Sequence, residues 1–429
     1  MRLLICSLLV FICTSGTSQR KTDSFLQEIL SRSDDSVFQK VLRQRDTFRV
    51  QIIYTQIDRD KKNKPSFKNF YFNVDSLFYF NPASTVKLPL ACLALEKLNK
   101  MHVAGVNKYT TMQFDSAYPH QEKLYADSTS EIGRPSIAQF IRKAFLVSDN
   151  DAYNRLYQFV GQQTINENLH AKGYRDVRIT REFMGFTADE NRHTNPIRFI
   201  NKDGRLVYSQ PMLYNTDSFD FSHVNKLGRA YYNNHDSLMN EPIDFSRVNN
   251  ISLEDLQQIL QSILFPESVP PKQRFDLTAD DYKFLYQYLS QFPSETNYPK
   301  YDTADYYDSY VKFFFRNGSH RMPDGVRVFN KVGWAYGFLI DVSYVADFKN
   351  NIEFMLSAVV YVNSDGVLND DKYDYDSVGW PFMYQLGQTI YQYELGRARK
   401  YKPDLGKFGI EYETRDVNDT RPAIKDVDN

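Results

Sequence analysis

The sequence predicts a mixed α/β fold in which segments from both ends of the chain build one sheet and a mainly helical lobe is inserted between them. Patterns typical of strands occur in residues 48–80 and again in residues 326–362, whereas apolar residues between these regions recur at helical spacing. Strands need neighbours for their backbone hydrogen bonds, so the two distant groups are expected to pair with each other. With 429 residues, 42% of them hydrophobic, the chain can bury the core of a two-lobed protein.

The N-terminal half begins with helical spacing of apolar residues in residues 22–43, which predicts one or two helices. Residues 48–54 and 70–80 are strand candidates, and the polar turn between them predicts a hairpin. After residue 83 the apolar period changes to 3.6, which predicts a helix there. Further helices are expected at residues 135–147, 151–160 and 164–172.

The C-terminal half contains two capped helices, a polar stretch and the second group of strands. Ser252 with Asp255 and Thr278 with Asp281 are capping-box-like pairs that mark two helix starts. The later elements are three strands and a final amphipathic helix, expected at residues 326–331, 336–345, 352–362 and 381–397.

These elements define the expected domain organisation. Residues 22–80 together with 326–400 form an α/β lobe, and residues 81–325 form a helical lobe with a polar, Asn-rich insertion at about 184–250. Residues 401–429 are expected to be a charged, loose tail. A cleft at the seam between the lobes is the expected place for a functional site.

Residues 1–18 have the pattern of an export signal. Arg2 is followed by an apolar run to Cys13 and then by small polar residues, which predicts cleavage near Ser18 and a periplasmic or secreted mature protein. Ile12 stands where lipoprotein signals carry a small residue, so a lipid anchor on Cys13 is not expected. The mature chain would have Cys92 as its one cysteine and no transmembrane span.

Charge and motif content exclude several function classes. The formal net charge of −1 offers no basic excess for nucleic acid. The sequence contains no His-Glu-x-x-His, no paired cysteine ligands, no Gly-x-Ser-x-Gly elbow and no phosphate-binding loop. We therefore expect no metal and no cofactor, and we expect the protein to act as a monomer.

The first chemical motif is Ser84-Thr85-Val86-Lys87, at a predicted helix start. Residues three apart share a helix face, so the hydroxyl and the amine can reach hydrogen-bonding distance. A neutral, desolvated lysine can take the serine proton and thereby make the hydroxyl nucleophilic. The same spacing recurs from Ser18 and from Ser309, so the preceding strand and the following helix are what distinguish Ser84.

Two further motifs each have a chemical and a structural interpretation. In Ser148-Asp149-Asn150 the serine could relay a proton to a leaving group and the asparagine could hold an amide, or the motif could cap the helix that follows. In Lys331-Val332-Gly333 a lysine beside a glycine suits a substrate carboxylate bound against a strand edge, or the motif could be an ordinary strand-end turn.

In this order, Ser-x-x-Lys, Ser-Asp-Asn and Lys-x-Gly form the signature of class A β-lactamases and penicillin-binding proteins. The sequence resembles this family of penicillin-recognising serine hydrolases from roughly residue 48 to residue 396. The resemblance implies a β-lactamase/transpeptidase-like fold, with a five-stranded antiparallel sheet flanked by helices and an all-helical lobe. It also implies that Ser84 is the acylated nucleophile, Lys87 the base for acylation and Ser148 the proton shuttle to the leaving nitrogen.

The resemblance assigns substrate binding to a second set of residues. Asn150 would bind the substrate's amide, and Lys331, next to Gly333, would attract its carboxylate. The backbone N–H groups of Ser84 and Trp334 would form the oxyanion hole.

Two positions depart from the family pattern. Val332 replaces the usual Thr or Ser. The missing hydroxyl removes one hydrogen bond to the substrate carboxylate, and a hydrogen bond to a charged acceptor contributes about 1.5–3 kcal/mol. The family clears its acyl-enzyme with a Glu in a Glu-x-x-Leu-Asn loop, a pattern that is missing here. Glu182 or Glu190 could take the role of the family's deacylating Glu, and Glu182 is the catalytic candidate. Alternatively, both could be solvated loop carboxylates.

The sequence thus predicts a serine hydrolase that acts on a cyclic or peptide amide through an acyl-Ser84 intermediate. β-Lactam hydrolysis is the leading interpretation. One alternative is a penicillin-binding-type D,D-peptidase or esterase that acts on cell-wall peptide. The other is a homologue that binds a ligand, or is acylated once, without turnover.

Overall fold

The structure is a computed structural model that describes residues 20–425. The predicted export signal, residues 1–18, lies outside the described residues. No helix within the described range combines the length and the apolar character that crossing a bilayer requires.

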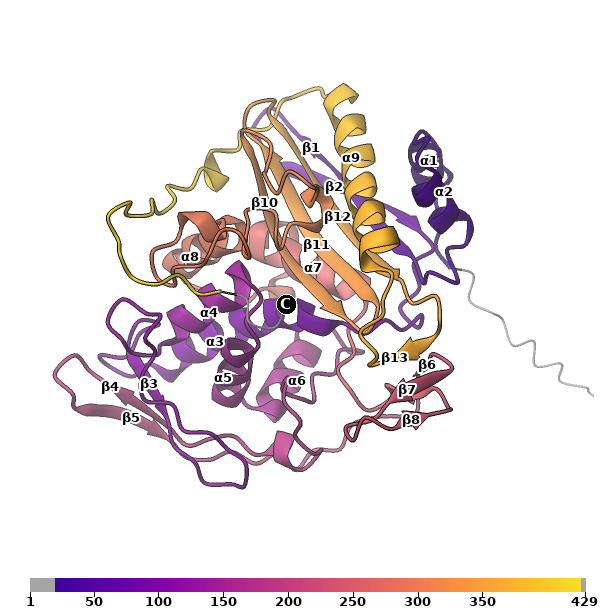
Figure 1. Ribbon diagram of the computed structural model, residues 1–429. Helices are drawn as coiled ribbons and strands as arrows, with labels where there is room; N and C mark the ends of the chain where they lie inside the picture. The colour runs from indigo at the N-terminus through magenta and orange to yellow at the C-terminus, as the bar shows by residue number, and fades with distance from the viewer. Residues whose placement is uncertain (1–19, 426–429) are drawn as a thin grey trace, which may run out of the picture.

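A five-stranded antiparallel sheet in the order β10-β11-β12-β1-β2 forms the centre of the first lobe. The register pairs Ile52 with Ala358, so strands from the two ends of the chain lie side by side, as Figure 1 shows. The expected fold class is therefore confirmed. The strands are β1 (Gln51–Arg59), β2 (Pro65–Phe72), β10 (Val326–Ala335), β11 (Phe338–Asp347) and β12 (Ile352–Tyr361).

Helices cover both faces of this sheet, and every residue of β11 and β12 is consequently buried. On one face α9 (Trp380–Gly396) packs with α1 (Ser24–Leu30) and α2 (Ser36–Arg43) over a continuous apolar cluster (Figure 1). On the other face α7 (Leu253–Leu264) contacts β1, β11 and β12. This second face adjoins the helical lobe, so the seam between the lobes lies there.

The helical lobe is built around α3 (Lys87–Met101), which is buried along most of its length. The predicted caps of α7 and α8 are confirmed, because Ser252 and Thr278 accept hydrogen bonds from the backbone N–H groups of Asp255 and Asp281. The other helices of this lobe are α4 (Ile137–Leu146), α5 (Asn150–Val160), α6 (Gln162–Ala171) and α8 (Ala279–Ser290).

Short strands occur in the helical lobe and in the polar insertion, most of which has no regular secondary structure. β7 pairs in parallel with β13 (Val367–Leu368), which follows the main sheet, so the insertion is attached to the first lobe. The short strands are β3 (Thr111–Phe114), β4 (Ile197–Ile200), β5 (Leu206–Gln210), β6 (Lys226–Leu227), β7 (Ala230–Tyr232), β8 (Leu238–Met239) and β9 (Ile243–Asp244).

Residues 401–425, expected to be a loose tail, form an ordered segment that packs on the rest of the chain. The ring of Phe408 is buried against Phe265 and Tyr344, and Arg415 donates hydrogen bonds to three backbone carbonyls. The prediction was wrong because the apolar residues of this charged segment follow no period. Leu405 and Phe408 are buried against distant parts of the chain, which only tertiary packing brings there, whereas Val417 is 94% exposed.

Candidate active site

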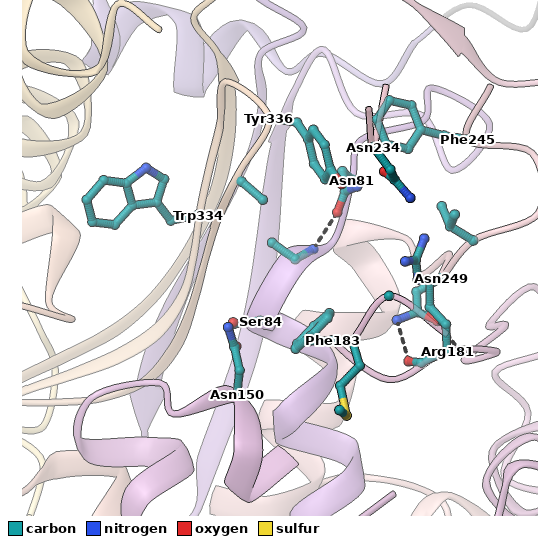
Figure 2. Close-up of a pocket in the computed structure, with 15 residues that line it drawn as sticks. Asn81, Ser84, Asn150, Arg181, Phe183, Asn234, Phe245, Asn249, Trp334 and Tyr336 are labelled. Carbon is teal, nitrogen blue, oxygen red and sulfur yellow. Dashed lines mark hydrogen bonds between the residues drawn. The ribbon is translucent and has the colours of Figure 1, made fainter. Parts of the chain in front are cut away.

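Ser84 lies in the 3₁₀ turn η1 (Ala83–Val86), which leads directly into α3. Ala83 has a φ of 46°, a left-handed conformation that costs a residue with a side chain about 1–3 kcal/mol. The Asn81 side chain accepts a hydrogen bond from the Ala83 backbone N–H at 2.9 Å and thereby holds this turn (Figure 2). Lys87 Nζ donates to Ser84 Oγ at 2.8 Å. The structure therefore brings the predicted hydroxyl and amine together.

The Lys87 amine is fully buried among neutral oxygen atoms. Besides Ser84 it donates to the Ser148 backbone carbonyl, to Ser148 Oγ at 3.3 Å and to Asn150 Oδ1 at 2.7 Å. Desolvation lowers the pKa of Lys87 to about 7, against a weaker opposing effect of the Asp149 charge. A substantial fraction of the amine is therefore neutral at neutral pH and can accept a proton from Ser84.

Ser148 lies between α4 and α5, and Asn150 is the first residue of α5. For this motif the sequence left both a helix cap and a catalytic role open. Asp149 takes the cap, because its side chain accepts from the Ala152 backbone N–H at 2.7 Å. The Ser148 and Asn150 side chains are therefore available to Lys87. Ser148 has a φ of 66°, a second strained residue next to the Ser84–Lys87 pair.

Lys331 lies within β10 and points at Ser148 rather than into open space. Its Nζ donates to Ser148 Oγ at 2.9 Å and to the Val332 carbonyl at 3.0 Å, and the residue is 1% exposed. Burial, and after it the nearby charge of Lys87, lower the pKa of Lys331 well below the ordinary lysine value. The Lys331 amine therefore contacts the site through the Ser148 hydroxyl, and its attraction for a substrate carboxylate stays a prediction.

Gly333 allows β10 to approach the turn that carries Ser84. A Cβ at this position would lie 2.7 Å from the Pro82 carbonyl oxygen and 3.1 Å from Thr85 Cγ2, and the first distance is too short for real carbon and oxygen atoms. The glycine of the third motif therefore sets the spacing between the strand edge and Ser84.

We expect Gly333→Ala to push β10 away from this turn. The overpacked methyl group should lower the free energy of unfolding by about 1–3 kcal/mol and slow any reaction at Ser84. Urea unfolding of the variant checks the first effect. Gly318→Ala is the matched control, since nothing lies within 4 Å of its Cβ position; equal stability of the two variants would contradict the argument.

Two cavities meet at Ser84. The first, of about 420 Å³, is called the Asn-lined cavity and contains Asn81, Asn234 and Asn249 in its wall (Figure 2). The second, of about 490 Å³, is called the Tyr-lined cavity and contains Tyr306 and Tyr310. Ser84, Asn150 and Trp334 line both cavities.

Most of the cavity wall was not identified from the sequence. Arg181 and Phe183 come from the loop after α6, and Asn234, Phe245 and Asn249 come from the insertion. The one sequence feature that pointed to these wall residues was indirect: the insertion lies between the second motif and the third.

Glu182, the predicted deacylating residue, lies beside the site but does not line either cavity. It is buried and accepts a hydrogen bond from Gln158 Nε2 at 3.0 Å, while the neighbouring ring of Phe183 lies 5.1 Å from Lys87 Nζ. Burial raises the pKa of Glu182 to about 8, so the carboxyl group is largely protonated at neutral pH. The loop presents Phe183 to the site and turns Glu182 towards α5. Glu190 binds His120 and Thr187 elsewhere on the loop.

Residues 35–204 match the model of the β-lactamase enzyme family (Beta-lactamase2), a segment that contains Ser84 and Ser148 and ends before β10. No curated protein sequence matches the chain.

The chain is also similar to solved β-lactamase structures. The one from Sphaerobacter thermophilus has 15% identity and a TM-score of 0.44, with 85% of this chain and 98% of that chain covered. The one from Burkholderia vietnamiensis has 11% identity and a TM-score of 0.47, with 86% and 99% covered. The one from Chitinophaga pinensis has 12% identity and a TM-score of 0.45, with 84% and 99% covered. The family match and the five-stranded antiparallel sheet with its flanking helices make the fold β-lactamase-like.

Proposed function

We propose that this protein is a serine hydrolase that opens a β-lactam or a similarly activated amide through an acyl-Ser84 intermediate. The observation that carries the proposal is the hydrogen bond of 2.8 Å between Ser84 Oγ and a buried Lys87 amine whose pKa lies at about 7. A hydroxyl beside such a base is the arrangement that an activated serine nucleophile requires. The match to the β-lactamase enzyme family supports the choice of a lactam amide.

In the acylation step the Ser84 proton passes to neutral Lys87 while Oγ attacks the carbonyl carbon. The C–N bond then breaks, and the leaving nitrogen takes a proton from Ser148 Oγ, which is replenished from Lys87 across their 3.3 Å contact. Asn150 holds the amide of the acyl part, and the backbone N–H groups of Ser84 and Trp334 stabilise the oxyanion. Lys87 is neutral again at the end and can activate the water that releases the acid from Ser84.

A second candidate function is acylation with slow release, as in a penicillin-binding-type peptidase or esterase or a protein acylated only once. No Asp or Glu is found among the described residues of the Asn-lined cavity. In the Tyr-lined cavity Asp149 caps α5, and Asp151 pairs with Arg155 at 3.2 Å. A carboxylate base for deacylation is thus missing from the part of the site that the structure describes.

The test is intact-protein mass spectrometry after incubation with benzylpenicillin, combined with steady-state hydrolysis of a chromogenic cephalosporin. Sustained hydrolysis supports the lactamase function. A persistent adduct without turnover selects the second candidate, and a protein that gains no mass and hydrolyses nothing contradicts both.

Glu182→Gln is expected to leave acylation and hydrolysis within about twofold of wild type, which corresponds to about 0.4 kcal/mol in the barrier. The carboxyl group is largely protonated at neutral pH and faces Gln158, and glutamine conserves its shape. Burst and steady-state rates measured beside Glu190→Gln check this expectation. Accumulation of the acyl adduct in Glu182→Gln alone would show that this carboxyl group does drive deacylation.

We also propose that the enzyme works as an exported monomer outside the cytoplasm. The pattern of residues 1–18 supports export. Cell fractionation and N-terminal sequencing of the mature protein test the location, and light scattering tests the oligomeric state.

A further inference from the structure

The Asn-lined cavity contains a single charged side chain among its described lining residues, that of Arg181. Its other polar lining is dominated by the amides of Asn81, Asn150, Asn234 and Asn249. Asparagine amides can donate hydrogen bonds and carry no charge, so they do not neutralise the guanidinium. The cavity is therefore positively charged and rich in donors.

Arg181 differs from the arginines that flank it along the chain. Arg178 donates hydrogen bonds to the carbonyls of Asp220 and Ser246, and Arg192 donates to those of Asn215 and Asp217. Within residues 20–425, the Arg181 guanidinium makes neither a hydrogen bond nor an ion pair.

The backbone of Arg181 is nevertheless fixed. Its N–H donates to Asn249 Oδ1 at 3.1 Å, and its carbonyl accepts from the Tyr153 hydroxyl at 2.9 Å. Figure 2 shows Arg181 and Asn249 together on the side of the cavity opposite Trp334. A rigid backbone thus presents an unpaired guanidinium to the cavity, a favourable arrangement for binding an anion.

The position of Ser148 decides which part of the substrate reaches Arg181, and this step rests on the proposed function. Ser148, the proton donor for the leaving nitrogen, lines the Tyr-lined cavity and is not among the described residues of the other. The leaving group therefore occupies the Tyr-lined cavity. The acyl part, joined to Ser84 at the meeting point, extends into the Asn-lined cavity.

We infer that the acyl part of the preferred substrate carries a carboxylate, which Arg181 binds with help from the Asn234 amide, while the buried Asn249 amide holds the Arg181 backbone. Guanidinium binds a carboxylate through two parallel hydrogen bonds, and charge-assisted bonds of this kind are stronger than neutral ones. The rings of Phe183 and Phe245 line the same cavity and accommodate the carbon skeleton that bears the acid. The subsite is separate from the Lys331 amine, which is buried behind Ser148.

Benzylpenicillin and carbenicillin form a matched pair for the test, because they differ by one carboxylate on the acyl side chain. Second-order acylation rate constants for both are measured by intact mass spectrometry on wild type, Arg181→Gln, Arg181→Lys and Arg175→Gln. We expect wild type to favour carbenicillin by about 10- to 100-fold. The ratio should fall to about one in Arg181→Gln and to an intermediate value in Arg181→Lys.

Arg175→Gln is the matched control, since Arg175 is an exposed arginine on the same segment and lines neither cavity. It should keep the wild-type ratio. Equal rates for the two penicillins on wild type, or an unchanged ratio in Arg181→Gln, would overturn the inference while leaving acylation of Ser84 intact.

If neither penicillin forms an adduct and neither is hydrolysed, the proposed function fails and the subsite is tested by binding alone. Phenylmalonamic acid and phenylacetamide then serve as probes in NMR titrations of wild type and Arg181→Gln. Preference for the acid that is lost in Arg181→Gln supports the subsite, and equal or no binding of the two probes rejects it.

Discussion

Ser84→Ala is expected to form no covalent adduct with benzylpenicillin and to lose hydrolysis by a factor on the order of 10⁶, the effect of removing a serine nucleophile in other hydrolases. The Ser84 hydroxyl accepts a hydrogen bond from Lys87, and Ser84 lines both cavities. Ser148 is no substitute, because its Oγ is engaged by both Lys87 and Lys331. Intact mass spectrometry of the variant checks the prediction.

Ser309→Ala is a control with the same local sequence pattern, since Ser309 and Lys312 repeat the Ser-x-x-Lys spacing. Burial also lowers the pKa of Lys312, but its Nζ donates to the carbonyls of Leu289 and Val328 and to Asn330. Ser309 is fully buried and lines neither cavity. Ser309→Ala should therefore acylate like wild type. The same adduct on Ser84→Ala would exclude Ser84 as the nucleophile.

Lys87→Met is expected to slow acylation by about 10²–10⁴-fold, the usual contribution of a general base. In wild type the acylation rate should rise with pH through about 7, because the neutral amine accepts the Ser84 proton and the ammonium does not. This rise should disappear from the pH profile of the variant. Stopped-flow acylation with a chromogenic cephalosporin between pH 5 and 9 gives both quantities.

Lys87→Arg separates base catalysis from charge. A guanidinium stays protonated across this pH range, so it keeps the positive charge beside Ser84 without being able to accept a proton. We expect Lys87→Arg to be as slow as Lys87→Met. Wild-type rates in Lys87→Arg would mean that the lysine acts as a fixed charge, and thermal unfolding of each variant shows that the fold is retained.

The sequence alone predicted the layout of the fold, because that layout depends on the periodicity of apolar residues and on the capping and turn residues that end each element. Strand patterns at the two ends of the chain, the helical spacing between them and the caps at Ser252 and Thr278 are local signals, and the structure reproduces them. The Ser84–Lys87 pair was also predictable, since one helical turn fixes the distance between residues three apart.

Tertiary structure decided what no local pattern encodes. It gave the cap of α5 to Asp149 and buried Lys331 behind the Ser148 hydroxyl. It also turned Glu182 away from the site and placed Phe183 there instead. Which of two adjacent residues, such as Glu182 and Phe183, faces the site depends on the space that distant segments leave for its side chain. Sequence spacing contains no information about that space.

The same reason explains the cavity walls and the C-terminal segment. Sequence by itself determined that this protein has a sheet made from both ends of the chain, an inserted helical lobe and a serine beside a lysine at a helix start. Only the folded chain decided that insertion residues line the cavity, that Phe408 joins the core and that the Arg181 guanidinium has no partner among residues 20–425. Those outcomes depend on desolvation and on contacts between distant segments, which arise only when the lobes pack against each other.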